Sequence, residues 1–169
     1  GIFVRSLLID AGRAHGVMRG QAAMAGGGLV GRVIDAGRRS ARILLLTDLN
    51  SRIPVLIHQS GYHGILAGTN QAKARLEHLP QDVDVGIGDR VITSGTGGVL
   101  PAGLPVGTVT AIGPDGVHIR PAADLSRVME VRLIGRPSSL TPVQSEVTSQ
   151  PQAAVPRGDR SVEAAAAAP

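Results

Sequence analysis

The chain has 169 residues, a length that suits one compact domain or two small ones and argues against a large enzyme. Apolar residues make up 43% of it, but Phe3 and Tyr62 are the only aromatic ones, so Val, Ile, Leu and Ala must fill any core, as in thin β-layers and small barrels. The net charge of +4 allows nucleic acid, anionic lipid or an acidic protein as partner, whereas the lack of cysteine excludes disulfides, thiolate metal sites and a cysteine nucleophile.

Short apolar runs rich in β-branched residues, each ended by a turn signal, predict β-strands along most of the chain. The 23 glycines and 11 prolines fall between these runs, which is typical of a protein with many turns and few helices. Apolar and polar residues alternate in residues 117–120 and 128–133, the pattern of a strand with one buried face. The predicted strands are residues 2–9, 28–34, 42–46, 53–57, 63–66, 74–79, 90–93, 106–112, 116–119 and 130–134.

Helix is expected to be scarce. Residues 123–127 are the best place for a single helical turn, because Asp124 lies near its start and Arg127 at its end, where each charge complements the helix dipole. No stretch reaches the roughly 18 apolar residues needed to cross a bilayer, and no signal peptide opens the chain. Since the sequence starts within a strand-like run, we expect an export or anchoring segment upstream in the full-length protein.

The predicted fold class is all-β, with two small β-barrel or sandwich modules. Residues 68–71 interrupt the strand pattern and place the expected border, so that residues 1–69 form the first β-module and residues 70–135 the second, with a last strand that can return to the first. Beyond these modules the composition changes to Ser, Thr, Pro, Gln and Ala, which predicts a disordered tail over residues 136–169.

The most distinctive segment is residues 88–107, which contains a turn, a strand, a glycine-rich loop, a turn stiffened by two prolines and a second strand. Its sequence order is Gly-Asp, then Val-Ile-Thr-Ser-Gly, then Gly-Gly, then Leu-Pro-Ala-Gly-Leu-Pro-Val-Gly. This order resembles the motif of the rod shape-determining MreC family. Weaker matches follow the family's order at residues 8–12, 16–17, 28–33, 45–48, 53–55, 64–68 and 121–125, so that the resemblance covers about residues 5–134.

We assign a structural role to the family-motif residues. They are Gly88, Asp89, Thr93, Ser94, Gly95, Gly97, Gly98, Pro101, Gly103, Leu104, Pro105, Gly107 and Pro121. The sequence alone assigns no partner-binding residue, because it does not reveal which strand lies at the edge of a sheet.

The resemblance implies a two-part β-barrel domain in the periplasm, anchored to the cytoplasmic membrane in the full-length protein only through an N-terminal segment that this sequence does not include. It implies a non-enzymatic scaffold of the cell-elongation (rod) complex, which maintains cell shape by binding and positioning or activating the peptidoglycan transpeptidase. The implied partners are a class B penicillin-binding transpeptidase, MreD, RodA and MreB, with self-association into a dimer or filament. No cofactor, metal or nucleic acid is implied. The chain departs from the family pattern because it lacks the N-terminal membrane helix and the coiled coil.

One alternative is a chymotrypsin-like β-barrel hydrolase, because His15, Asp48 and Ser94 follow one another in the order of that catalytic triad. Order alone is weak evidence, and the neighbours of Ser94 lack the Gly-Asp-Ser-Gly-Gly arrangement of those proteases. The test is whether Ser94 lies within hydrogen-bond reach of a histidine.

A second alternative is a basic nucleic-acid-binding barrel, favoured by the cluster around Arg38 and Arg39 together with Arg32 and Arg42 but opposed by the near absence of aromatic stacking residues.

Two further patterns favour structural roles. Residues 26–31 fit the glycine spacing of a dinucleotide-binding loop, but a strand is predicted to follow where a helix is required. The histidines lack the spacing of a zinc site; they are His15, His58, His63, His78 and His118.

Overall fold

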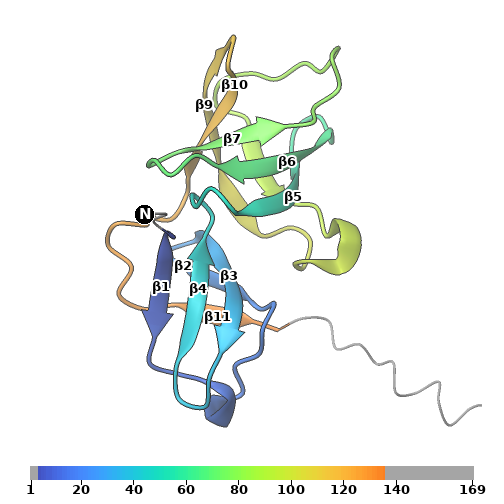
Figure 1. Ribbon diagram of the computed structural model, residues 1–169. Coiled ribbons are helices and arrows are strands. Elements are labelled where there is room, and N and C mark those ends of the chain that lie inside the picture. Colours follow the sequence, from blue (N-terminus) through green and yellow to red (C-terminus); the bar gives the residue numbers. More distant parts are fainter. Residues whose placement is uncertain (1–3, 136–169) are drawn as a thin grey trace, which may run out of the picture. The chain divides into compact units, whose positions relative to one another are not determined.

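Eleven strands and two short 3-10 helices make up residues 4–135, which are the residues that the computed structural model describes (Figure 1). The first elements in chain order are β1 (Ser6–Ile9), η1 (Arg13–His15), β2 (Ala22–Ala25), β3 (Gly28–Ala36), β4 (Ala41–Leu45), β5 (Arg52–Ile57) and β6 (His63–Gly68). The remaining elements are β7 (Ala74–Glu77), β8 (Arg90–Thr93), η2 (Thr96–Gly98), β9 (Pro105–Gly113), β10 (Gly116–Pro121) and β11 (Arg132–Ile134).

Five strands form an open antiparallel sheet in the order β1-β4-β3-β2-β11. Its last strand comes from the far end of the described chain, since β11 pairs with β2 and places Leu133 opposite Ala23. The two outermost strands, β1 and β11, each have a neighbour on one side only. An open sheet of this kind exposes backbone hydrogen-bonding groups along both edges.

The other six strands close into a barrel in the order β10-β7-β6-β5-β8-β9. Sheet membership changes between Leu45 and Arg52, earlier in the chain than the expected border at residues 69 and 70. The turn residues at 68–71 connect β6 to β7 within the barrel. They were interpreted as a module border because the same residue types form the turn of a hairpin and a linker between modules. The division of the chain into two modules stays a prediction.

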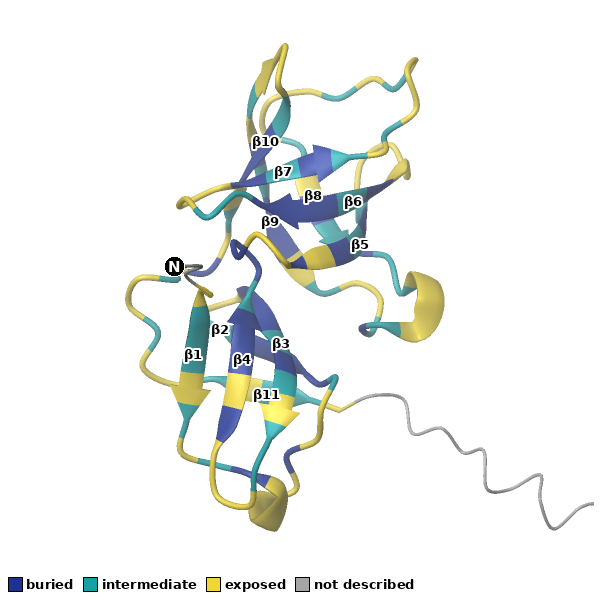
Figure 2. Cartoon of the chain, in the orientation of Figure 1, coloured by how far each residue is buried: buried dark blue, intermediate teal, exposed yellow. Residues whose placement is uncertain are grey.

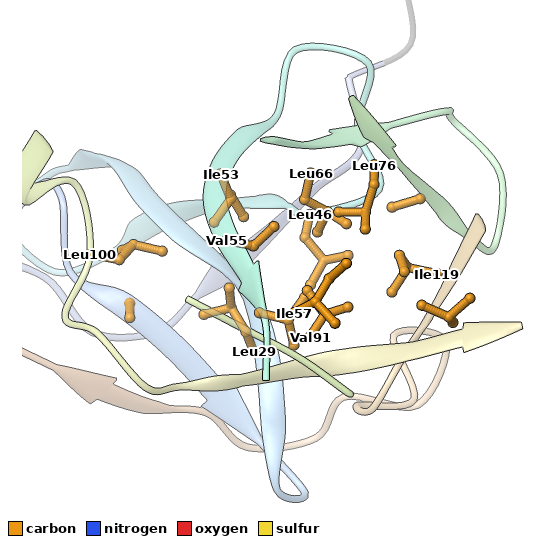
Figure 3. Close-up of a cluster of buried hydrophobic side chains, with 14 of the residues drawn as sticks. Leu29, Leu46, Ile53, Val55, Ile57, Leu66, Leu76, Val91, Leu100 and Ile119 are labelled. Carbon is orange, nitrogen blue, oxygen red and sulfur yellow. The ribbon is translucent and has the colours of Figure 1, made fainter. Parts of the chain in front are cut away.

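Aliphatic side chains and Met24 fill the larger core, which contains no aromatic residue, as the near absence of aromatic residues predicts. Figure 3 shows Leu29 and Leu46, from the open-sheet half of the chain, among barrel residues such as Ile57 and Val91. These side chains are at most 1% exposed, and burial of each contributes about 1.5 to 3 kcal/mol. A smaller cluster, which includes Val30, lies in the open sheet. The all-β prediction with very little helix is confirmed.

Two local predictions differ from the structure. Strand β2 was not predicted, because its sequence Ala-Ala-Met-Ala contains no β-branched residue; it is strand by virtue of its pairing with β3 and β11. The helical turn predicted at residues 123–127 is wrong. Asp124 instead accepts hydrogen bonds from the backbone and hydroxyl of Ser126, and its carbonyl accepts from the Arg127 amide, which makes a tight turn.

The predicted tail over residues 136–169 lies outside the described residues. Within residues 4–135, neither helical segment has the length or the apolar character to span a bilayer.

Candidate protein-interaction surface

The family motif forms one wall of the barrel and the loop beside it. Gly88 and Asp89 form the turn before β8, Thr93 ends that strand, and Ser94 to Leu104 make the loop to β9. Pro105 opens β9, and Gly107 pairs with Pro121 at the end of β10. The family-motif residues within this loop are Ser94, Gly95, Gly97, Gly98, Pro101, Gly103 and Leu104.

Thr93 fastens this loop to the barrel. Its buried hydroxyl donates to the Pro101 carbonyl over 2.6 Å and accepts from the Leu104 amide over 2.8 Å. Buried polar groups that are satisfied in this way stabilise a loop, and leaving them unpaired costs about 1 to 3 kcal/mol. These contacts support a structural role for the motif.

Two motif glycines occupy positions that other residues tolerate poorly. Gly97 has a φ of 72°, in the left-handed region that favours glycine. Gly107 has ordinary backbone angles, but a Cβ there would lie 2.2 Å from the Arg120 carbonyl oxygen on β10. The first residue shapes the loop, and the second permits the close approach of β9 and β10.

The three residues of the hydrolase alternative have separate partners. His15 Nδ1 accepts from the Gly12 amide over 3.0 Å, the buried Asp48 carboxylate accepts from the Asn50 amide over 2.7 Å, and the Ser94 hydroxyl bonds to Thr96 Oγ1 over 2.9 Å. Ser94 shares a pocket of about 180 Å³ with two histidines, His63 and His78, but that pocket is lined by no carboxylate. Among the hydrogen bonds of residues 4–135, none joins Ser94 to a histidine, so the geometry does not support a triad.

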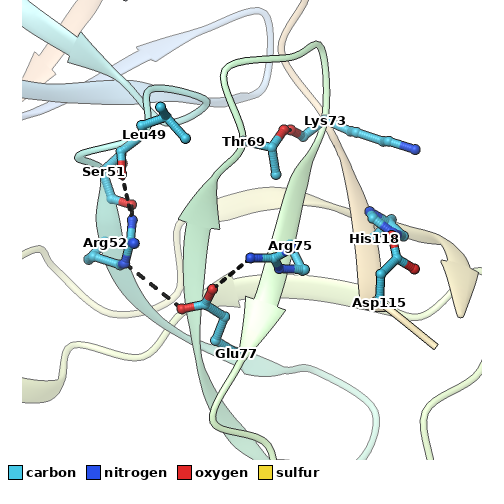
Figure 4. Close-up of polar contacts among 9 residues, drawn as sticks. All are labelled: Leu49, Ser51, Arg52, Thr69, Lys73, Arg75, Glu77, Asp115 and His118. Atoms are coloured by element: carbon cyan, nitrogen blue, oxygen red, sulfur yellow. Dashed lines mark hydrogen bonds and ion pairs between the residues drawn. The ribbon is translucent and has the colours of Figure 1, made fainter. Parts of the chain in front are cut away.

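Some of the charged side chains form local pairs on the barrel (Figure 4). On β7, Glu77 Oε2 lies 3.1 Å from Arg75 Nη2, and Glu77 Oε1 lies 3.9 Å from Nε of Arg52 on β5. At the β9–β10 hairpin, His118 Nε2 donates to Asp115 over 2.8 Å, and this hydrogen bond, with one from the Asp115 backbone, lowers the pKa of the Asp115 carboxyl. Within the described part of the chain, no three His, Cys, Asp or Glu side chains gather closely enough to hold a metal ion.

The glycine-rich segment at 26–31 is the β2–β3 hairpin and the start of β3, so a strand follows it and a dinucleotide-binding loop is not formed. The basic cluster lies on the same sheet. Arg38 and Arg39 are exposed in the β3–β4 turn, Arg42 is exposed on β4, and Arg32 is half-buried on β3.

Strand β1 has a free edge. The Leu45 amide donates to the Arg5 carbonyl, and the ladder continues with Leu7 opposite Ile43. Hydrogen-bonded and non-bonded pairs alternate in an antiparallel ladder, so the amides and carbonyls of Ser6 and Leu8 point away from β4. No backbone hydrogen bond of residues 4–135 outside the ladder uses them. The edge of β1 can therefore receive another strand.

A groove of about 500 Å³ runs beside this edge, between β1 and the extended segment that leads into β11. We call it the β1 groove, and eight of its ten lining residues are apolar. Two of its side chains are unusually exposed for apolar residues, Leu8 at 68% and Met129 at 91%. Figure 2 shows β1 exposed and half-buried where the adjacent β4 is largely buried. The lining residues are Leu7, Leu8, Ile9, Asp10, Ala11, Val128, Met129, Glu130, Val131 and Leu133.

The combination of a free edge and an apolar groove suits strand addition, in which main-chain hydrogen bonds supply affinity and side-chain pockets supply selectivity. The sequence contains a partial signal for this groove, since alternation at residues 128–133 supported the strand predicted at residues 130–134, of which only Arg132–Ile134 is paired. It did not identify β1 as an edge, because strand order depends on pairing between distant segments.

Comparisons with known proteins agree with this architecture. The profile described as "Rod shape-determining protein MreC, barrel core" matches residues 2–135. The cell shape-determining protein MreC of Cereibacter sphaeroides is 45% identical over 142 residues, covering 83% of this chain and 47% of the relative. That of Caulobacter vibrioides is 44% identical over 107 residues, covering 63% and 31%. The chain thus spans less than half the length of either relative.

Solved structures are similar as well. The crystal structure of MreC from Pseudomonas aeruginosa has a TM-score of 0.73 at 34% identity, over 79% of this chain and 90% of that one. A structure described as the major periplasmic domain from the cell shape-determining filament MreC has a TM-score of 0.70 at 31% identity, over 79% and 89%. A complex between penicillin-binding protein PBP2 and MreC from Helicobacter pylori has a TM-score of 0.56 at 20% identity, over 66% and 74%, and that likeness shows the fold alone.

Proposed function

This chain belongs to the rod shape-determining MreC family, and on that premise we propose that it is a periplasmic scaffold region that binds a class B penicillin-binding transpeptidase and catalyses no reaction itself. A solved relative described as a periplasmic domain supports the compartment, and a relative solved in complex with PBP2 supports the partner class. MreD, RodA, MreB and further copies of the chain are proposed partners on the family resemblance.

The observation that carries this proposal is the free edge of β1 beside the β1 groove. An extended segment of the transpeptidase adds to the edge through the outward amides and carbonyls of Ser6 and Leu8. Its apolar side chains cover Leu8 and Met129, which are now mostly exposed to water. Asp10 and Glu130 are the charged residues of the lining, so a segment that also carries a basic residue fits best.

Binding of this kind acts on the transpeptidase by shifting its conformational equilibrium. A scaffold that binds one conformation of the enzyme more tightly raises the population of that conformation by the ratio of the two affinities. A tenfold preference corresponds to about 1.4 kcal/mol, which one well-buried leucine can supply. No side chain of the scaffold needs to perform chemistry.

The test is a binding titration of the full chain against the purified periplasmic region of a class B penicillin-binding protein. Leu8→Glu places a charge at the edge and is expected to weaken binding at least about tenfold. Ile87→Glu is the matched control, because Ile87 is 72% exposed, precedes strand β8 of the barrel and does not line the groove. It is expected to bind as the unmodified chain does.

Leu8→Pro sharpens the test. Proline removes the outward amide of residue 8 but leaves the bonded pairs at residues 7 and 9, so the sheet is expected to persist while strand addition is lost. The proposal is wrong if Leu8→Glu and Leu8→Pro both bind with unchanged affinity while remaining folded. Loss of binding in Ile87→Glu alone would instead place the partner on the barrel.

A further inference from the structure

Positive charge is concentrated in one of the two sheets. Residues 4–45 and 132–135, which form the open sheet and its loops, contain eight arginines and two carboxylates. The barrel, residues 52–121, contains five basic residues and five carboxylates. In the barrel, Glu77 pairs with Arg52 and Arg75, whereas no ion pair of residues 4–135 uses an arginine of the open sheet. The arginines of the open sheet thus have no carboxylate partner within residues 4–135.

Several of them gather at one end of the sheet. Helix η1 packs against the β3–β4 turn, because the Arg13 amide donates to the Gly37 carbonyl over 2.8 Å and the Ala14 amide donates to the Arg38 carbonyl over 2.9 Å. Arg13 Nη1 also donates to the Ala36 carbonyl over 2.9 Å. Figure 1 shows η1 and this turn side by side at the lower end of the sheet. These contacts hold the backbone of Arg13 close to that of Arg38, so arginines from two separate loops lie near one another.

We call this cluster the basic tip, and define it as the exposed side chains of Arg13, Met18, Arg19, Arg38 and Arg39. Met18 is 53% exposed, so the tip also presents an apolar side chain beside its charges. Arg13 belongs to η1, Met18 and Arg19 belong to the segment between η1 and β2, and Arg38 and Arg39 belong to the β3–β4 turn at the end of the sheet (Figure 1). A cluster of this kind fits an extended, deformable anionic surface.

From these observations we infer that the basic tip docks on an anionic phospholipid bilayer, with its arginines at the headgroup phosphates and Met18 in the interfacial layer. The arginine guanidinium matches a phosphate group by two parallel hydrogen bonds. A flexible apolar side chain next to basic residues is the composition of interfacial membrane contacts. An acidic protein would need a concave face complementary to two loops, whereas lipid headgroups rearrange around them.

This inference goes beyond binding of the transpeptidase and does not depend on it. The tip lies on the η1 and β3–β4 loops, whereas the β1 groove is lined by residues 7–11 and 128–133. Docking of the tip restricts the rotation of the domain at the membrane surface. It therefore limits the directions in which the groove can meet a partner that is itself held at the membrane.

The test is cosedimentation of the full chain with vesicles of phosphatidylcholine alone or with about one third phosphatidylglycerol. The expected result is binding to the anionic vesicles only, which falls steeply as salt rises and screens the headgroup charge. Arg38→Glu/Arg39→Glu is expected to lower the partition coefficient at least about tenfold. Arg90→Glu/Arg120→Glu is the control, because it changes the net charge equally at two exposed barrel positions and is expected to lower binding much less.

Circular dichroism and thermal unfolding of both double variants establish that they are folded. The Arg38 side chain is dispensable for the η1 contact, since the bond to Ala14 uses the backbone carbonyl. Equal binding to both vesicle types, or equal loss in the two double variants, would overturn the inference. Binding to soluble polyglutamate with none to anionic vesicles would overturn it in favour of an acidic protein. These outcomes leave the transpeptidase proposal untouched, because that proposal is tested without lipid.

Discussion

The barrel and the open sheet are built from the same types of aliphatic residue, but only the open sheet has strand edges that another chain could pair with. Six strands close the barrel, so each of them has two neighbours and no backbone edge remains for another chain. The open sheet stops at β1 and β11, and beside β1 it leaves a groove with two exposed apolar side chains. Closure makes the barrel a structural element, whereas the lack of closure gives the sheet a surface that can bind.

The two regions differ in charge as well as in closure. Carboxylates balance basic residues within the barrel, and arginine dominates the sheet. The family motif lies in the balanced, closed region, where Thr93 and Gly107 hold the β8–β9 segment in place. A motif that is easily recognised in a sequence can thus mark the part of a protein that supports the binding surface, not the surface itself.

The largest expected effect comes from opening the barrel. Gly107→Val places a side chain against the Arg120 carbonyl and is expected to lower the free energy of unfolding by about 3 kcal/mol or more. Gly135→Val is the control, because a Cβ at Gly135 would meet no atom within 4 Å; its expected effect is within about 0.5 kcal/mol. Urea unfolding measures both. Equal stability of the two variants would show that close approach of β9 and β10 does not require this glycine.

A smaller loss is expected from the loop beside the barrel. Gly97→Val forces a β-branched residue into a left-handed backbone conformation and is expected to cost about 1 to 2 kcal/mol in the same urea experiment. Since the loop belongs to the barrel and not to the β1 groove, affinity for the transpeptidase is expected to stay within about twofold of the unmodified chain. Unchanged stability would contradict the structural interpretation of the motif loop. A large loss of affinity would show that the loop belongs to the binding surface.

The smallest expected effect concerns the paired charges of the barrel. The hydrogen bond from His118 lowers the pKa of Asp115 below its ordinary value of 3.8, so the folded state favours the ionised carboxyl. The stability that this provides is present above pH 3.8 and is lost as the pH falls through the lower folded-state pKa. Asp115→Asn is therefore expected to lower the melting temperature slightly at pH 7 and to have no such effect in strong acid. A difference that grew on acidification would contradict this sign.

Much of the fold could be predicted from the sequence, since β-branched runs between turn residues located most of the strands. Strand β2 was not predicted because alanine carries little strand preference, and its four residues become strand only through pairing with β3 and β11. A module border was expected near residues 68–71, where the structure has the β6–β7 hairpin, because glycine and asparagine occur in hairpin turns and in linkers alike. The β1 groove could not be predicted, since it exists only when residues 7–11 and 128–133 meet in space.

The central claim is that β1 offers its free edge to the transpeptidase, and amide hydrogen exchange measured by NMR tests it most directly. In the free chain, the Ser6 and Leu8 amides point away from β4 and are expected to exchange faster than the Leu7 and Ile9 amides, which belong to bonded pairs. With the partner bound, Ser6 and Leu8 are expected to become protected while the exchange of Leu7 and Ile9 changes little. If Ser6 and Leu8 exchange at the same fast rate in the saturated complex, strand addition at β1 is contradicted.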